Sequence, residues 1–231
     1  MRTVLLAAIG VALISLPDVS FAQEYPHAFP RPGVVKIMEN ERVLVWEATW
    51  PADVTQVYHQ HQYDMTGVFL RWGPLRVTRL DGTFTESLEP FEIPWVFFLE
   101  KGVTHIEEGI GDPVRHSIMI DLKEGSPPRL EGRTDFPSSF PQEGAEEVLD
   151  NDRVRVWSLE PRPGQTIPMH FHDRDFISVV LEGGTLALKG ADGREERTTW
   201  AYKDVRFVPR GEVHSIEVVS GTPRIMIFEL K

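Results

Sequence analysis

The sequence contains no cysteine among its 231 residues. Disulfide bonds, thiolate nucleophiles, cysteine-ligated zinc and a lipid anchor on an N-terminal cysteine are therefore excluded. Without a covalent cross-link, an exported protein of this composition has to obtain its stability from its hydrophobic core.

Clusters of basic residues are also missing. The chain has 24 Lys and Arg against 35 Asp and Glu, and its formal net charge is -11. Nucleic acids and anionic membranes bind clustered Lys and Arg, so neither is expected as a partner. The acidic residues are scattered, which indicates a solvated surface. A small-molecule substrate is the expected partner, and a homodimer is compatible with the same surface.

Long apolar runs are absent except for one at the N-terminus. Arg2 precedes an apolar stretch over residues 4–16, and Ser20-Phe21-Ala22 supplies the small residues that signal peptidase requires. This pattern predicts a secretory signal peptide, residues 1–22, and a secreted or periplasmic protein, with a bacterial periplasm fitting best. The stretch is shorter than the ~20 residues of a spanning helix, although an uncleaved anchor is the alternative. After cleavage the chain is expected to be soluble and free of the membrane.

The histidines that are present form a repeated pattern. Six of the eight fall into two sets, each a His-x-His pair followed by a single histidine more than forty residues later. The sets are His59, His61 and His105 in the first half, and His170, His172 and His214 in the second. The two pairs are offset by 111 residues, as from His59 to His170.

Other landmarks repeat in the same order. Residues 39–46 align with 150–157, and Asp81-Gly82 aligns with Asp192-Gly193, both at the offset of 111. Such order indicates a duplicated unit. The predicted organisation is a signal peptide (1–22), a Pro-rich N-terminal arm (23–35), a first domain (36–123), a linker (124–143) and a second domain (144–231).

Each unit is predicted to be all-β. Short runs rich in β-branched and aromatic residues are bounded by turn residues, and no long stretch has helical periodicity. The predicted strands are 43–46, 67–70, 75–78, 96–99 and 118–120, then 154–157, 177–181, 185–188, 205–208 and 225–228. The two Asp-Gly pairs predict type I′ hairpin turns. Many short strands at even spacing favour sandwiches or barrels.

The His-x-His spacing suits a metal site. Alternate residues of a strand point to the same face, so His59 and His61 project together, as do His170 and His172. Neutral imidazole binds Fe, Cu, Zn, Mn or Ni, so histidine alone does not select the metal. Three protein ligands leave coordination positions open, which is typical of a catalytic site. The alternative is that these histidines form hydrogen bonds inside an empty barrel.

The chain resembles a bicupin of the cupin superfamily. The residues that match the two family motifs are Gly164, His170, His172, Gly183, Pro209, Gly211 and His214 in the second half, and His59, His61, Gly102 and His105 in the first. Asp53 and Glu100 replace the usual Gly and Pro of the first half. The resemblance implies two tandem cupin barrels of the jelly-roll, or double-stranded β-helix, type, each with a three-histidine metal site.

The chain departs from the family at the usual glutamate ligand. Phe176 stands there in the second half and Met65 in the first, while Asp175 and Asp64 lie one position earlier. Strand alternation turns these aspartates away from the metal unless a bulge intervenes, and a hydrogen bond at the surface or between the domains is the alternative. The predicted ligand set is therefore three histidines per domain without a carboxylate.

Three-histidine cupins include dioxygenases, so the resemblance implies an exported metal-dependent dioxygenase acting on a small oxygen-bearing organic molecule. A non-catalytic binding protein for a sugar, another small molecule or a metal is one alternative, and a metal-dependent isomerase or lyase is another. No catalytic residue beyond the ligands is assigned. Among the remaining residues, Tyr58, Gln60 and Tyr63 flank the first histidine pair and would either line a pocket or pack beside the strand. His27 is expected to be solvated, and His116 is expected on an exposed strand face.

Overall fold

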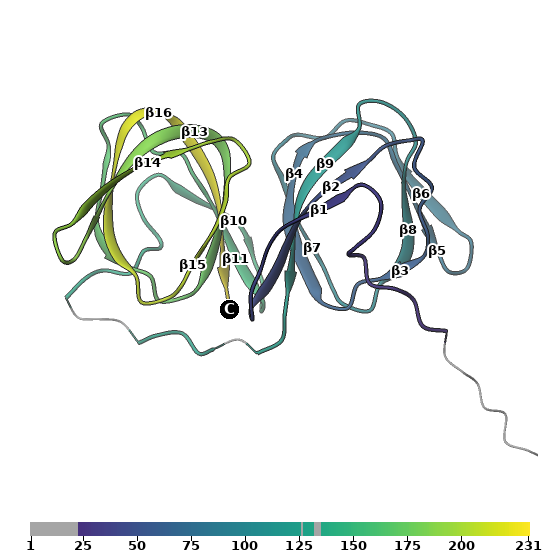
Figure 1. Cartoon of the computed structure of the whole chain (residues 1–231), viewed down its shortest axis with the longest axis horizontal. Coiled ribbons are helices and arrows are strands. Elements are labelled where there is room, and N and C mark those ends of the chain that lie inside the picture. The colour runs from purple at the N-terminus through teal and green to yellow at the C-terminus, as the bar shows by residue number, and fades with distance from the viewer. Residues whose placement is uncertain (1–22, 126, 132–134) are drawn as a thin grey trace, which may run out of the picture.

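The computed structural model describes residues 23–125, 127–131 and 135–231. These residues form two β-barrels side by side (Figure 1), and the paired strands are antiparallel throughout. No helix occurs in the described part of the chain. The predicted all-β fold of two tandem jelly-roll barrels is thereby confirmed.

Barrel 1 combines two sheets with the strand orders β1-β2-β9-β4-β7 and β3-β8-β5-β6. Its strands are β1 (Val34–Glu39), β2 (Val43–Trp50), β3 (His59–Gln60), β4 (Asp64–Arg71), β5 (Leu75–Arg79), β6 (Phe84–Ser87), β7 (Trp95–Leu99), β8 (Thr104–Gly109) and β9 (Arg115–Leu122). Trp46 and Trp50 on β2 are fully buried in its core. Each predicted strand of this half lies within an observed one.

Barrel 2 repeats this plan with fewer, longer strands. They are β10 (Ala145–Asp150), β11 (Val154–Leu159), β12 (Thr166–Phe171), β13 (Phe176–Gly190), β14 (Glu195–Trp200), β15 (Val205–Val208) and β16 (Val213–Leu230). β13 corresponds to β4 and β5 together, which Gly73-Pro74 separates in barrel 1. Proline lacks the N–H that a continuous ladder needs, whereas β13 continues through Gly183-Gly184 by shifting its register.

The repeat begins earlier in the chain than the motifs alone indicate. His27 bridges Gln60 and Ser138 bridges Phe171, both in parallel, at the same offset of 111 residues. The expectation that His27 is solvated is wrong, because its side chain is only 11% exposed and its Nε2 lies 3.0 Å from Asp121 Oδ2. Segments predicted as an arm and a linker therefore each return to a barrel.

A continuous apolar cluster joins the two barrels. Strands of both contribute to it; its buried members are Val43, Val45, Val68, Ile118, Ile120 and Leu122 from barrel 1, and Val154, Val156, Ile177, Val179, Met226, Phe228 and Leu230 from barrel 2. Burial of apolar surface is the main stabilising term in such a contact. The barrels consequently pack face to face through one shared core.

Two ion pairs related by the repeat cross this interface. Arg153 Nη1 lies 2.7 Å from Asp64 Oδ2, and Arg42 pairs with Asp175 in the same way. The other oxygen of each aspartate accepts a hydrogen bond from the backbone N–H of Lys101 or Arg210. Asp64 and Asp175 thus make the inter-domain contact that was the alternative to metal ligation.

The interface also explains His116. Its expected exposure is wrong: the residue is 8% exposed and its Nε2 lies 2.6 Å from Glu47 Oε1. Lys203 of barrel 2 donates to the same oxygen at 2.7 Å. The partner barrel covers a strand face that would be open in a single domain.

The predicted type I′ turns are wrong as well. Gly82 and Gly193 have φ near +81°, but among described non-glycine residues only Lys203 has a positive φ, so neither Asp does. A type I′ turn requires positive φ at both central residues. Gly82 N–H donates to Arg79 C=O at 2.9 Å, and Arg79 N–H donates to Thr83 C=O. This is the longer hairpin loop in which glycine alone takes the left-handed conformation.

Among the described residues, no helix is long and apolar enough to cross a bilayer. The predicted signal peptide, residues 1–22, lies outside the described residues.

Candidate metal centres

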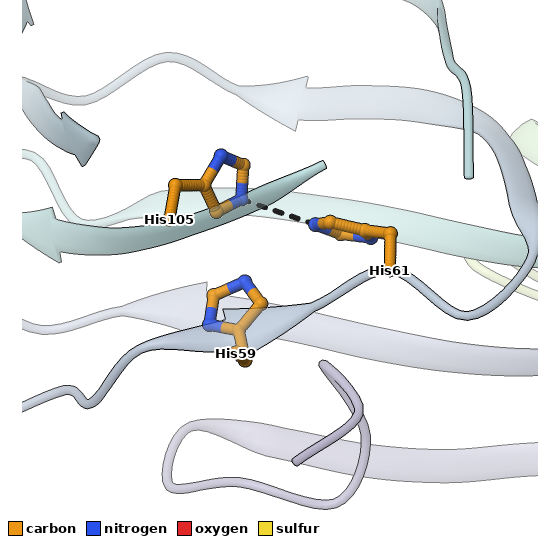
Figure 2. Close-up of side chains that lie close together, drawn as sticks. All are labelled: His59, His61 and His105. Carbon is orange, nitrogen blue, oxygen red and sulfur yellow. Dashed lines mark hydrogen bonds between the residues drawn. The ribbon is translucent and has the colours of Figure 1, made fainter. Parts of the chain in front are cut away.

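The three histidines of barrel 1 converge in its interior. His59 lies on β3, His61 follows two residues later, and His105 lies on β8, where it pairs directly with His59 in the ladder. The ring centroids are 4.9–5.2 Å apart, and His61 Nε2 lies 3.0 Å from His105 Nε2. Figure 2 shows the three rings turned toward a common point.

Barrel 2 repeats the arrangement. His170 on β12 pairs with His214 on β16, and His172 follows the end of β12. His172 Nε2 lies 3.2 Å from His170 Nε2 and 3.3 Å from His214 Nε2. In each barrel, one ligand-type nitrogen per histidine lies within 4.8 Å of the other two.

Backbone carbonyls orient the first histidine of each set. His59 Nδ1 lies 3.3 Å from Val57 C=O, and His170 Nδ1 lies 2.8 Å from Pro168 C=O. A ring that donates its Nδ1–H to a carbonyl keeps the Nε2 lone pair free, which is the arrangement of metal-binding histidines. The two carbonyls are themselves related by the offset of 111 residues.

Burial keeps these imidazoles neutral. It lowers the pKa of His59 to about 4 and that of His61 to about 3, and it lowers the pKa of His105 as well. In barrel 2 it lowers the pKa of His172 to about 2 and that of His214 to about 4, and that of His170 also falls. Only neutral imidazole binds a metal, so protons do not compete for the nitrogens at neutral pH.

The spacing and an unpaired nitrogen atom fit a metal ion. Two nitrogens that share an ion at about 2.1 Å lie roughly 3.0–3.4 Å apart for right-angle to tetrahedral geometry. The closest Nε2 separations, 3.0–3.3 Å, fall in this range. His59 Nε2 is buried without a hydrogen-bond partner. A divalent transition metal could therefore bind in each barrel, and its identity remains open among Fe, Cu, Zn, Mn and Ni.

The family's usual glutamate has no replacement at its own position. Met65 is buried in the core of barrel 1, and Phe176 packs on His172 with ring centroids 4.6 Å apart. Both side chains are apolar and supply no ligand. Tyr58 donates to Arg79 C=O, Tyr63 packs edge-on against His27, and Gln60 Nε2 donates to Thr104 Oγ1.

A carboxylate that the sequence reasoning missed lies beside the first triad. Glu107 Oε1 is 3.7 Å from His105 Nε2, and Glu107 Oε2 is 4.0 Å from His59 Nε2. Burial raises the pKa of Glu107, but attraction to His105 and Arg31 outweighs it and the net pKa is lowered. The signal was available in the sequence, since Glu107 follows His105 by two residues on one strand and shares its face.

No protein-family model matches the chain, and no curated protein is similar to it in sequence. Solved structures do resemble it. AerE of Microcystis aeruginosa has a TM-score of 0.60 at 14% identity, over 90% of this chain and 98% of that one. A cupin 2 conserved barrel domain protein of Leptotrichia buccalis has a TM-score of 0.51 at 10% identity, over 86% and 88%.

Oxalate decarboxylase of Bacillus subtilis, an enzyme with Mn(II) centres, has a TM-score of 0.54 at 12% identity, over 86% of this chain and 72% of that one. At such identities the likeness concerns the fold. Two antiparallel barrels in tandem, each enclosing three histidines, give this chain a fold similar to that of these cupin-barrel proteins.

Proposed function

We propose that each histidine triad binds one divalent transition-metal ion and that the protein is a metal-dependent dioxygenase for a small oxygen-bearing organic molecule. The observation that carries the proposal is the convergence of three neutral imidazoles in each barrel, all buried in barrel 1 and with only His214 partly exposed in barrel 2. Three protein ligands leave room for a substrate and for dioxygen at each ion.

The ligand chemistry favours an anionic, chelating substrate. Imidazoles carry no charge, so a bound ion keeps its full positive charge and acts as a Lewis acid toward an enolate, catecholate or diketonate. In barrel 1 the chain adds an ion pair beside the triad, formed by the buried Arg31 guanidinium and the Glu107 carboxylate. Trp50 and Gln56 contact Arg31 and fix its position.

A metal-dependent lyase or isomerase is the second candidate, and Glu107 is the observation that favours it. A buried carboxylate beside the triad is placed to accept a hydrogen bond from a small molecule bound among the imidazoles. Oxalate decarboxylase, which shares the fold, is itself a carbon–carbon lyase by name. This chemistry requires no net consumption of dioxygen, which separates it from the first candidate.

Oxygen uptake tests the proposal. The protein loaded with iron, copper or manganese is supplied with diketones, flavonols or phenolics in an oxygen electrode. We expect the wild-type protein to consume oxygen. His59→Ala and His170→Ala should each reduce this uptake, because each removes one ligand of a triad. Substrate conversion without uptake would select the lyase or isomerase. Metal binding without conversion of any compound would instead indicate a non-catalytic binding protein.

We further propose that the protein is exported. The apolar segment and Ser20-Phe21-Ala22 support cleavage after Ala22 and a secreted or periplasmic mature chain. Because the chain has no cysteine, folding after export would not require disulfide formation.

A further inference from the structure

The two triads have different surroundings, and the difference centres on Glu107. On β8, Glu107 follows His105 by two residues and therefore projects to the same face. Its two oxygens lie 3.7 Å from His105 Nε2 and 4.0 Å from His59 Nε2. The side chain is only 12% exposed, so water screens its charge weakly.

Neighbouring side chains hold this carboxylate in one orientation. Arg31 Nη2 donates to Glu107 Oε2 at 2.9 Å, and Trp50 Nε1 donates to the same oxygen at 3.2 Å. Arg31 is itself 4% exposed and donates to Gln56 Oε1. Because both bonds fall on Oε2, Oε1 remains directed at the imidazoles.

Glu107 lies beside the triad and not within it. The nitrogens of the three histidines are within 4.8 Å of one another, and the carboxylate does not join that group. From this position it can attract a cation held by the imidazoles and accept a hydrogen bond from a small molecule placed among them. Residues that act in this way around a metal site commonly change its affinity about 10–100-fold.

Barrel 2 has no equivalent charge pair. Two residues after His214 on β16 stands Ile216, which packs against the apolar core of that barrel. The residue at the repeat position of Arg31 is Gln142. Among the described residues, the two duplicated sites therefore differ: a Glu–Arg ion pair lies beside the triad of barrel 1, and uncharged residues stand at the equivalent positions of barrel 2.

We infer that Glu107 makes barrel 1 the tighter of the two metal sites, with Arg31 as the residue that positions its carboxylate. This inference rests on the proposed function, since it requires that both triads bind metal.

Titration of the metal-free full-length mature protein with Co²⁺, followed by visible absorption and calorimetry, tests the inference. We expect two classes of site, of which His59→Ala removes the tighter and His170→Ala the weaker. Glu107→Gln should weaken the tighter class about 10–100-fold and leave the other unchanged. Glu108→Gln is the matched control, because the adjacent residue carries the same charge and points away from the triad.

A second variant separates the loss of the Glu107 charge from misfolding caused by an unpaired Arg31. Glu107→Gln leaves Arg31 buried without its ion-pair partner, so Arg31→Gln/Glu107→Gln removes both charges together and should show the same loss of affinity. Cobalt binding that is equal in Glu107→Gln and Glu108→Gln would overturn this inference alone. Failure of the wild-type protein to bind cobalt would overturn both the inference and the proposed metal sites.

Discussion

Replacing Asp175 by asparagine distinguishes a contact between the barrels from a metal ligand. Asp175 pairs with Arg42 across the interface, where the two side chains are 8% and 13% exposed. It also accepts the backbone N–H of Arg210. Asparagine can retain this second bond but not the charge, so Arg42 remains in the interface without its partner.

The expected loss follows from this geometry. Removal of one partner of a buried ion pair costs about 3–5 kcal/mol of unfolding free energy. Because asparagine keeps one acceptor oxygen, we expect the lower end, about 3 kcal/mol. For a chain of this size that corresponds to a fall in Tm of roughly 6–12 °C. Asp64→Asn should lose less, because its partner Arg153 is 23% exposed and also donates to Leu122 C=O.

Thermal unfolding of the metal-free protein, followed by circular dichroism, measures the loss. Metal content measured in parallel should not change, because Asp175 contacts Arg42 and the backbone of Arg210. Asp152→Asn, at an exposed position, is the control. The assignment of Asp175 to the interface fails if the variant loses a metal ion per chain while its Tm stays at the wild-type value.

Three further predictions concern the rest of the chain. Burial lowers the pKa of His27, but its bond to Asp121 and the charge of that residue outweigh burial and raise the pKa above 6.5. The wild-type protein should therefore be more stable than His27→Gln below pH 6.5, and this difference in unfolding free energy should disappear as the pH rises through the raised pKa. Unfolding of both proteins at several pH values measures the difference. Trp157 Nε1 donates a hydrogen bond to the buried Glu229 carboxylate at 2.6 Å. Trp157→Phe removes this donor and should lower the unfolding free energy by about 1–3 kcal/mol, as denaturant unfolding would measure. Mass spectrometry of the exported protein should give a chain that begins at Gln23.

The sequence allowed much of the fold to be predicted because the repeat and the strand period are local signals. The offset from His59 to His170 identified the duplication, and alternation placed both members of each His-x-His pair on one face. The repeat also identified the third histidine of each set, His105 and His214, and the family motif matched both. The structure brings each set together.

Apart from the turn type of the two hairpins, the errors concern contacts between distant segments. His116 is buried because barrel 2 covers it, and His27 is buried because the N-terminal segment folds back onto barrel 1. Neither partner lies near these residues in the sequence. Glu107 was missed for a different reason, because the family motif places its glutamate near the His-x-His pair and not two residues after His105.

Metal analysis of the native protein tests the central claim most directly. Elemental analysis of protein purified from its own compartment should find about two transition-metal ions per chain, because each barrel holds three neutral imidazoles at ligand spacing. His59→Ala and His170→Ala should each reduce the content to about one. A native protein that contains no transition metal and takes up none on dialysis against Fe, Cu, Zn, Mn or Ni would contradict the account.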